Sequence, residues 1–388
     1  MVLSADTGGM KFALVAGETS GDLLAGLLLD GLKERWSDLK SMGIGGARMQ
    51  ERGFQAWWPC DKLAVRGYVE VLRHYREITG IRKQLKERLL VDRPDVFIGV
   101  DAPDFNLDLA RDLREQGIKT IQFVSPSIWA WRGERIEKIK KSVDHVLCIF
   151  PFEPSIYEKH GISASYVGHP LANVIPLKPN KDKARLALNL AIDDVVVAVL
   201  PGSRASEIQY LGETFIETIA LMLQARPKVK VLIPAVPLLR QKIVQQLERS
   251  LSLDQMKQVQ VLHGQSHMAL EACDVSLVAS GTATLEAALY KRPMVIAYKM
   301  NVLSWWKMRR MKYQAWVGLP NILCQDFIVP EFLQEAATPK ALSDAVWNWV
   351  DNPAKGSSVV ERFTALHLEL LRDTPYLAAQ DVAGVMAR

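Results

Sequence analysis

The sequence predicts an α/β protein with two doubly wound, Rossmann-like domains that face each other across a cleft. Short apolar segments rich in β-branched residues alternate with helical patterns in both halves of the chain. Prolines and polar residues interrupt this alternation between Tyr166 and Asn180, as in an interdomain linker. Glycine- and hydroxyl-rich turns follow several predicted strands, where α/β proteins place their ligands.

Composition excludes several classes of protein. The 388 residues suffice for two or three domains, and 49% hydrophobic with 23% charged residues describe a chain with sizeable cores. A net charge of +5 allows an anionic substrate or membrane surface and does not indicate nucleic-acid binding. Four widely spaced cysteines and no apolar run near ~18 residues predict a cytoplasmic protein without disulfides, a zinc site or a membrane span.

The first half is predicted to hold a flexible extension, residues 1–9, and a domain over residues 10–176. Its expected strands are Lys11–Ala16, Asp95–Val100, Ile118–Val124 and Val143–Ile149, while Gly43–Gly46 is interpreted as a turn. Glu18, Thr19 and Ser20 follow the first strand, in a turn whose glycines could equally serve the chain reversal alone. Asp101 follows the second strand and has no evident role in capping a helix.

The second half is predicted to form a domain over residues 177–355, followed by helices over residues 356–388. Its expected strands are Val195–Leu200, Val229–Pro234, Gln258–Leu262, Val275–Ala279 and Met294–Ala297. The regular spacing of strands and helices is the same as in the first half. Both halves are therefore expected to contain a parallel sheet.

The stretch Val195–Glu207 organises the second half. An unbroken apolar strand leads into Pro201-Gly202, and a helix is expected to begin near Ser203. Such a junction directs backbone N–H groups and a helix N-terminus at one point, which suits an anion. Arg204 adds a planar cation that can grip a phosphate in two places. The alternative is an ordinary βα turn with a solvated arginine.

A second junction, Ala279–Glu286, has the same design. Gly281 and Thr282 open a helix after a buried strand and can hold a phosphate, and Glu286 can bind the two hydroxyls of a ribose. His263 is expected in a loop of the same rim. His267 lies four residues further on, but the loop-like residues between them and the missing glutamate give no indication of a metal site.

Two segments combine apolar and basic residues. They are Leu63–Leu72, which precedes the basic segment Arg73–Lys86, and Asn301–Tyr313, which interleaves tryptophans with lysines and arginines. The second resembles an interfacial helix that can meet anionic lipid. Packing against a core, with the cations extended to solvent, explains both segments equally well.

Seven motifs in a single order resemble bacterial lipid-A-disaccharide synthases. Each motif alone is weakly specific, but the whole series, from Phe12 to Asn321, is highly specific. The motifs are VAGETSGD (Val15–Asp22), VDAPDFN (Val100–Asn106), SPSIWAWR (Ser125–Arg132), VGHP (Val167–Pro170), LPGSR (Leu200–Arg204), ASGTATLE (Ala279–Glu286) and LPN (Leu319–Asn321).

The resemblance implies an inverting glycosyltransferase of lipid A biosynthesis with the two-domain fold called GT-B. Such an enzyme transfers 2,3-diacylglucosamine from UDP-2,3-diacylglucosamine to 2,3-diacylglucosamine 1-phosphate and releases UDP. It implies no cofactor and no metal, peripheral association with the cytoplasmic face of the inner membrane, and allows a homodimer. It also implies that the first domain binds the acceptor, the second binds the UDP-sugar, and the C-terminal helices pack back toward the first domain.

The resemblance also gives roles to the candidate residues. Asp101 matches the family's candidate base, and Arg204, with the Gly202 and Ser203 amides, would neutralise the pyrophosphate. The other expected substrate-binding residues are Glu18, Thr19 and Ser20 for the acceptor, Gly281, Thr282, Glu286 and His263 for UDP, and Asn321 at a polar position of the active site.

Three other functions remain open on the same fold. Two are enzymes that act on UDP-sugars, a hydrolysing 2-epimerase and the N-acetylglucosaminyltransferase of peptidoglycan synthesis, neither of which needs the VDAPDFN and SPSIWAWR loops. The third is a membrane-associated sensor of UDP-sugars, which needs the UDP motifs but not Asp101.

Overall fold

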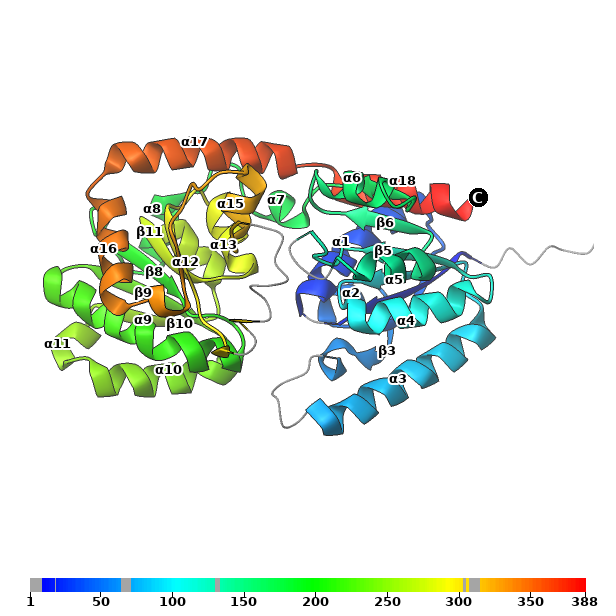
Figure 1. Cartoon of the computed structure of the whole chain (residues 1–388), viewed down its shortest axis with the longest axis horizontal. Helices are drawn as coiled ribbons and strands as arrows, with labels where there is room; N and C mark the ends of the chain where they lie inside the picture. Colours follow the sequence, from blue (N-terminus) through cyan, green and yellow to red (C-terminus); the bar gives the residue numbers. More distant parts are fainter. Residues whose placement is uncertain (1–8, 18, 64–70, 130–132, 303–304, 307–314) are drawn as a thin grey trace, which may run out of the picture. The chain divides into compact units, whose positions relative to one another are not determined.

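A computed structural model describes residues 9–17, 19–63, 71–129, 133–302, 305–306 and 315–388 (Figure 1). The chain divides into two compact units. Unit 1 comprises Met1–Asn173 and Leu370–Arg388, and unit 2 comprises Val174–Glu369. Each unit is built around a parallel sheet covered by helices, which confirms the predicted α/β class.

The described part of unit 1 contains a sheet of seven parallel strands in the order β3-β2-β1-β4-β5-β6-β7. From β1 the chain first builds outward to β3 and then returns to build β4 on the other side of β1. The strands are β1 (Lys11–Ala16), β2 (Lys40–Gly45), β3 (Gln55–Pro59), β4 (Val96–Val100), β5 (Lys119–Phe123), β6 (His145–Cys148) and β7 (Ala164–Tyr166).

Amphipathic helices cover this sheet. In α4, Pro103 begins the helix, and Phe105, Leu109 and Leu113 are buried at a spacing of four residues. Figure 1 shows α3, α4 and α5 side by side, and α1 beside α18. The helices are α1 (Thr19–Arg35), α2 (Ala47–Gln50), α3 (Val71–Asp92), α4 (Pro103–Arg114), α5 (Arg135–Ser142), α6 (Glu153–Glu158), α7 (Pro170–Val174) and α18 (Thr374–Met386), with a short 3-10 turn, η1 (Cys60–Lys62).

The described part of unit 2 contains a six-stranded parallel sheet in the order β10-β9-β8-β11-β12-β13. The strands are β8 (Val196–Leu200), β9 (Lys230–Ala235), β10 (Val259–His263), β11 (Val275–Ala279), β12 (Met294–Tyr298) and β13 (Glu331–Leu333). The helices are α8 (Lys181–Ala187), α9 (Ala205–Ala225), α10 (Pro237–Ser250), α11 (Leu253–Met256), α12 (Ser266–Ala272), α13 (Thr282–Leu289), α15 (Leu319–Cys324), α16 (Pro339–Val350) and α17 (Pro353–Leu370), with η2 (Gln334–Ala336).

The C-terminal helices divide between the units. We expected the helices over residues 356–388 to pack back toward the first domain. In the structure α17 belongs to unit 2 up to Glu369, and α18 belongs to unit 1, where it packs on α1. Gly31 of α1 permits this contact, because a side chain there would collide with the backbone of Pro375.

One expectation from glycine was wrong, and the expected linker was confirmed only in part. Gly43–Gly46 was interpreted as a turn, but Gly43 lies inside β2, where a side chain would collide with the carbonyl oxygen of Leu14 on β1. The expected linker Tyr166–Asn180 does contain the change from unit 1 to unit 2, between Asn173 and Val174, but its first residues belong to the fold of unit 1, because Tyr166 ends β7 and His169 is buried. In this stretch a side chain at Gly168 would collide with Arg372, so Gly43 and Gly168 both allow the close approach of two segments.

His169 is a buried neutral base. It is 4% exposed, its ring packs on Phe150 with centroids 5.5 Å apart, and its Nδ1 accepts a hydrogen bond from the Leu171 N–H at 3.2 Å. Burial lowers the pKa of the imidazole to about 3. Below about pH 6.5 His169 therefore binds a proton in the unfolded chain but not in the folded chain. Acid for this reason lowers the free energy of unfolding.

We expect the stability cost of His169→Asn to shrink as the pH falls, because asparagine can accept the same hydrogen bond but has no proton to gain. Between pH 6.5 and 5 the wild-type protein should lose about 2 kcal/mol that the variant keeps. Urea unfolding of both proteins at pH 7.5, 6.5, 5.5 and 5 measures the difference. A difference that stays constant over this range would contradict a buried neutral His169.

Candidate active site

The predicted UDP loops of unit 2 follow neighbouring strands. β8 and β11 pair in register, with Leu200 opposite Val278, so the turns after them emerge at the same edge of the sheet. The strand order also reverses here, because β9 and β10 lie on one side of β8 and β11 to β13 on the other. In doubly wound sheets this reversal point is where ligands bind.

The carboxylate of Glu207 lies where we expected an anion. Its Oε2 accepts hydrogen bonds from the backbone N–H groups of Ser203, at 2.8 Å, and Arg204, at 3.2 Å. A side chain at Gly202, whose φ is +109°, would collide with this carboxylate. The expected open anion site at Gly202 and Ser203 is therefore closed by Glu207 in this structure, and an incoming phosphate must displace that carboxylate to reach the Ser203 N–H.

The guanidinium of Arg204 extends from the same turn. Its side chain is 68% exposed and lies 3.8 Å from the Glu207 carboxylate. An ion pair this exposed contributes little to stability. Arg204 thus lies exposed in the turn after β8, and its contact with a phosphate stays a prediction.

The second loop presents a helix N-terminus. Gly281 is the N-cap of α13, with φ +157°, and Thr282 is the first residue of the helix; both are exposed. The Thr284 hydroxyl donates a 2.8 Å hydrogen bond to the Gly281 carbonyl and so fixes the turn. The N–H groups at this end of α13 are suited to an anion.

Glu286 lies one turn into α13, close to His267, which was not among the predicted site residues. His267 Nε2, on α12, is 3.6 Å from Glu286 Oε2, and its ring packs edge-on against Tyr290. Burial raises the pKa of the Glu286 carboxyl, while His267 and a hydrogen bond from Ser266 lower it. His263, a predicted site residue, ends the edge strand β10. Strands β9 and β8 separate β10 from β11 in the sheet.

Asp101 stands at the corresponding reversal point of unit 1. β1 and β4 pair in register, with Ala16 opposite Val100, and Asp101 directly follows β4. Asp101 and Ala102 have φ values of +53° and +40°, which ordinary residues rarely adopt. A side chain at Gly17, after β1, would come within 2.5 Å of the Ala102 Cβ, so the turns after β1 and β4 lie against each other.

The GETSGD turn has a structural part as well as a candidate site. Glu18 lies outside the described residues, Thr19 is the first residue of α1, and Ser20 is exposed. Asp22 is buried, and its carboxylate accepts hydrogen bonds from the N–H groups of Gly46, Arg48 and Met49 at 2.7, 2.9 and 3.2 Å. The motif therefore ties α1 to the segment after β2.

Comparison with known proteins decides the family. The family model described as lipid-A-disaccharide synthetase matches residues 12–382. The chain belongs to this family. Among curated relatives, the lipid-A-disaccharide synthase of Albidiferax ferrireducens is 62% identical over 97% of both chains, and that of Aromatoleum aromaticum is 50% identical over 97% of this chain and 96% of the relative. The predicted lipid-A-disaccharide synthase activity in lipid A biosynthesis is thus confirmed.

Solved structures similar to this synthase confirm the GT-B fold class. A UDP-GlcNAc 2-epimerase from Neisseria meningitidis bound to UDP-GlcNAc has a TM-score of 0.64 at 12% identity and covers 97% of this chain and 100% of its own. The kitacinnamycin glycosyltransferase has a TM-score of 0.62 at 18% identity, with 98% and 99% covered. At such low identity these likenesses concern the fold alone.

Asn321 occupies a supporting position in the synthase. It is fully buried, and its Nδ2 donates to Val329 O and Glu331 Oε1, both at 2.8 Å, while its Oδ1 accepts from the N–H groups of Ile328 and Val329 at 2.9 and 3.0 Å. The side-chain amide is fully used by these bonds. These bonds tie α15 to the segment that leads into β13, so the amide has no hydrogen-bonding group left for the substrate contact that we expected.

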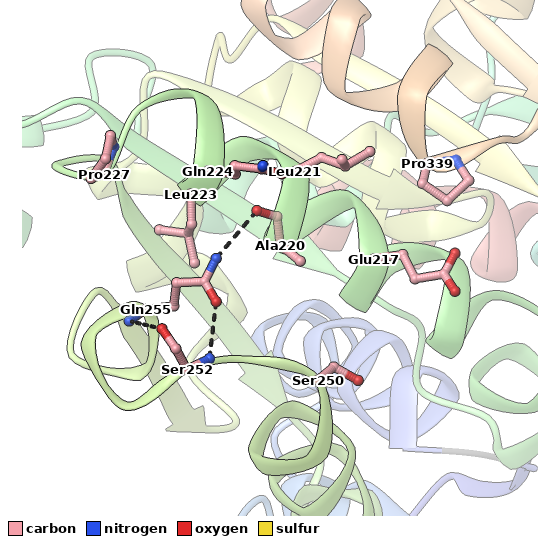
Figure 2. Close-up of a pocket in the computed structure, with 10 residues that line it drawn as sticks. All are labelled: Glu217, Ala220, Leu221, Leu223, Gln224, Pro227, Ser250, Ser252, Gln255 and Pro339. Carbon is pink, nitrogen blue, oxygen red and sulfur yellow. Dashed lines mark hydrogen bonds between the residues drawn. The ribbon is translucent and has the colours of Figure 1, made fainter.

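A hollow of about 740 Å³ lies elsewhere in unit 2 (Figure 2). It is lined by the second half of α9, the end of α10 and the segment around Gln255, whose amide donates to Ala220 O at 3.4 Å. These segments lead into the amino ends of β9 and β10, whereas the candidate loops follow the carboxyl ends of β8 and β11. None of the predicted site residues that the structure describes lines this hollow.

Proposed function

We propose that this synthase transfers 2,3-diacylglucosamine from UDP-2,3-diacylglucosamine to 2,3-diacylglucosamine 1-phosphate, with inversion at the anomeric carbon. The products are a β-1,6-linked disaccharide 1-phosphate and UDP. The observation that carries the proposal is family membership across residues 12–382, with 62% identity to a curated lipid-A-disaccharide synthase. The substrate identities follow from the resemblance of the seven sequence motifs to this family.

In the proposed reaction unit 2 binds the UDP-sugar. The Arg204 guanidinium and the N-terminal N–H groups of α13 at Gly281 and Thr282 neutralise the pyrophosphate, and Glu286 accepts hydrogen bonds from the ribose. Arg204 and the N-terminus of α13 follow the neighbouring strands β8 and β11, which supports this arrangement, because charge on the departing UDP grows in the transition state. Displacement of the Glu207 carboxylate adds the Ser203 N–H to the phosphate contacts.

Unit 1 supplies the base in the proposed reaction. The Asp101 carboxylate removes the proton from the 6-hydroxyl of the acceptor as that oxygen attacks the anomeric carbon of the donor. Glu18, Thr19 and Ser20 line the acceptor side. The position of Asp101 at the point where the order of the unit 1 strands reverses supports this role.

Product analysis tests the reaction. Purified protein in detergent is incubated with both substrates, with and without EDTA, and the products are followed by mass spectrometry. We expect equal amounts of disaccharide phosphate and UDP, unchanged by EDTA. UDP without disaccharide would instead indicate a hydrolase or epimerase on the same fold, and UDP binding without turnover would favour a sensor.

The two acylated substrates support a peripheral position on the cytoplasmic face of the inner membrane. The described residues include no helix long and apolar enough to cross a membrane. Most of Leu63–Leu72 and of Asn301–Tyr313 lies outside the described residues, but Val302 and Trp306 are 69% and 56% exposed. Exposed apolar residues beside cations suit an anionic lipid surface. A homodimer is a further proposal, which light scattering in detergent would test.

Vesicle flotation tests the membrane segment. We expect the double variant Trp305→Ser, Arg309→Ser to separate from vesicles containing anionic lipid, because it loses both an aromatic contact and a cation. The wild-type protein should float with anionic vesicles and much less with zwitterionic ones. Undiminished flotation of the double variant would assign the contact to Leu63–Leu72 instead.

A further inference from the structure

Three residues with unusual backbone conformations lie together in unit 1. Asp101, Ala102 and Val124 have φ values of +53°, +40° and +72°. A positive φ is rare for any residue with a side chain and is an outlier for a β-branched valine. They occupy the turns after the neighbouring strands β4 and β5. Such strained conformations persist only where surrounding contacts hold them, and they concentrate at functional sites.

One buried amide joins both turns. Gln122, 1% exposed on β5, donates hydrogen bonds from Nε2 to Asp101 O at 3.0 Å, Val124 O at 3.2 Å and Phe123 O at 3.3 Å. A single side chain therefore binds the carbonyls of two of the three strained residues. The backbone N–H of Asp101 also donates to Phe123 O at 3.0 Å, which ties the same two turns a second time.

A second buried amide holds Asp101 from the helix side. Asn106, fully buried on α4, donates from Nδ2 to Asp101 O at 2.8 Å and more weakly to Val15 O at 3.3 Å and Val100 O at 3.5 Å. The Asp101 carbonyl thus accepts from two side-chain amides, one on α4 and one on β5. The Oδ1 of Asn106 is buried without a hydrogen-bond partner among the described residues, so the hold on the turn comes from the N–H groups of the two amides.

Gly99 makes room for this pair of amides. A Cβ at position 99 would approach the Asn106 side chain at 2.8 Å and Gln122 Oε1 at 2.9 Å. Gly99 is on β4, two residues before Asp101, and its φ is not in the positive region, so close packing rather than backbone freedom calls for glycine here. Glycine at position 99 therefore leaves space for the Asn106 and Gln122 side chains beside the Asp101 turn.

We propose that Gln122 is a positioning residue that, together with Asn106, holds the strained Asp101 turn so that the Asp101 carboxylate is aimed at the acceptor hydroxyl. The inference rests on the proposed role of Asp101 as the base. It gives a function to a glutamine that contacts no substrate itself. Misplacing a reacting group by about 1 Å costs roughly 10²-fold in rate, which sets the scale of the expected effect.

The variant Gln122→Met tests this role, because methionine keeps the length of the side chain and removes its N–H groups. We expect kcat to fall roughly 10- to 100-fold while the affinity for UDP, which unit 2 provides, is unchanged. Thr120→Val is the matched control. Thr120 is also fully buried on β5, and its hydroxyl hydrogen bonds to Ser142 O and Asp144 Oδ2 lie at the amino end of the strand. This control should keep the wild-type kcat even where it lowers the melting temperature.

A double-mutant cycle with Asp101→Asn separates this role from a general loss of structure. If Gln122 acts through Asp101, Gln122→Met should lower the rate of the Asp101→Asn enzyme by less than about twofold. An equal fold-loss in both backgrounds would overturn the inference, as would a wild-type kcat for Gln122→Met. A wild-type kcat for Asp101→Asn alone would instead reject the proposed base.

The second amide provides an independent route if Gln122→Met does not fold. Asn106→Ala removes the other side-chain donor to the Asp101 carbonyl and changes a helix rather than a sheet strand. The same cycle then applies, with protein concentrations normalised to the stoichiometry of UDP binding. A loss of kcat that disappears in the Asp101→Asn background supports the positioning role of the two amides, and a loss that persists there contradicts it.

Discussion

The Asp101→Asn variant should bind UDP as tightly as the wild-type protein and turn over roughly 10²- to 10⁴-fold more slowly. The amide has the shape of the carboxylate but cannot accept the proton of the acceptor hydroxyl. UDP binding should be spared, because Asp101 belongs to unit 1 and the proposed UDP contacts belong to unit 2. Calorimetry with UDP and mass-spectrometric rates with both substrates measure the two properties separately.

Asp112→Asn is the matched control for this experiment. Asp112 lies on α4, the helix that follows Asp101, but near its other end, where it pairs with Lys86 at 2.8 Å and Arg111 at 2.9 Å. Loss of a partly exposed ion pair costs about 1 kcal/mol or less. Wild-type turnover in Asp101→Asn would remove Asp101 as the base, and equal losses in both variants would point to a general effect of charge.

The Arg204→Ala variant should lose both UDP affinity and rate. Hydrogen bonds to a charged partner contribute about 1.5–3 kcal/mol, which corresponds to roughly 10- to 100-fold in the UDP dissociation constant. The rate should fall further, because the charge on the leaving UDP is greatest in the transition state. The nearby Glu207 adds to both effects, since without Arg204 its negative charge, 3.8 Å away in the wild-type protein, faces the diphosphate uncompensated.

Arg249→Ala is the matched control for Arg204→Ala. It also removes one arginine, but from the opposite end of the unit 2 strands. Arg249 is exposed in the last turn of α10, which leads toward the amino end of β10. Its loss should leave UDP binding unchanged at the same ionic strength. If calorimetry finds wild-type UDP affinity in Arg204→Ala, the assignment of Arg204 to the pyrophosphate is wrong. A Glu207→Gln exchange in the Arg204→Ala background should recover part of the lost affinity.

Local patterns were sufficient to predict the elements that hold the site. Val195–Leu200 and Val275–Ala279 read as buried strands because they are short, apolar and β-branched, and both are strands in the structure. The residues after them were recognisable because helix N-termini and phosphate-binding turns have characteristic glycines and hydroxyls. β2 was missed because Gly43 carries the same signal as a turn, although here it allows β2 to approach β1.

The residues that support the candidate site could not be predicted in this way. Gln122 is 21 residues from Asp101, and His267 and Glu286 come from different helices. Glu207 is close in sequence to the turn at Gly202 and Ser203, but the sequence shows only a glutamate in the first turn of a helix. The structure shows that its carboxylate binds the N–H groups of that turn. Asn321 was expected to contact substrate, and only its four internal hydrogen bonds show that it is part of the scaffold.

The sequence alone determined the fold class, the family and the loops that carry the candidate chemistry, because each is encoded in residues close together along the chain. The tertiary structure decided which side chains meet at those loops. Strand order brings the turns after β8 and β11, and after β1 and β4, to shared edges. Burial then decided that the Asp22 carboxylate and the Gln122 N–H groups bind backbone partners, and that Asn321 binds backbone groups and Glu331, since a buried polar group without a hydrogen-bond partner destabilises the fold.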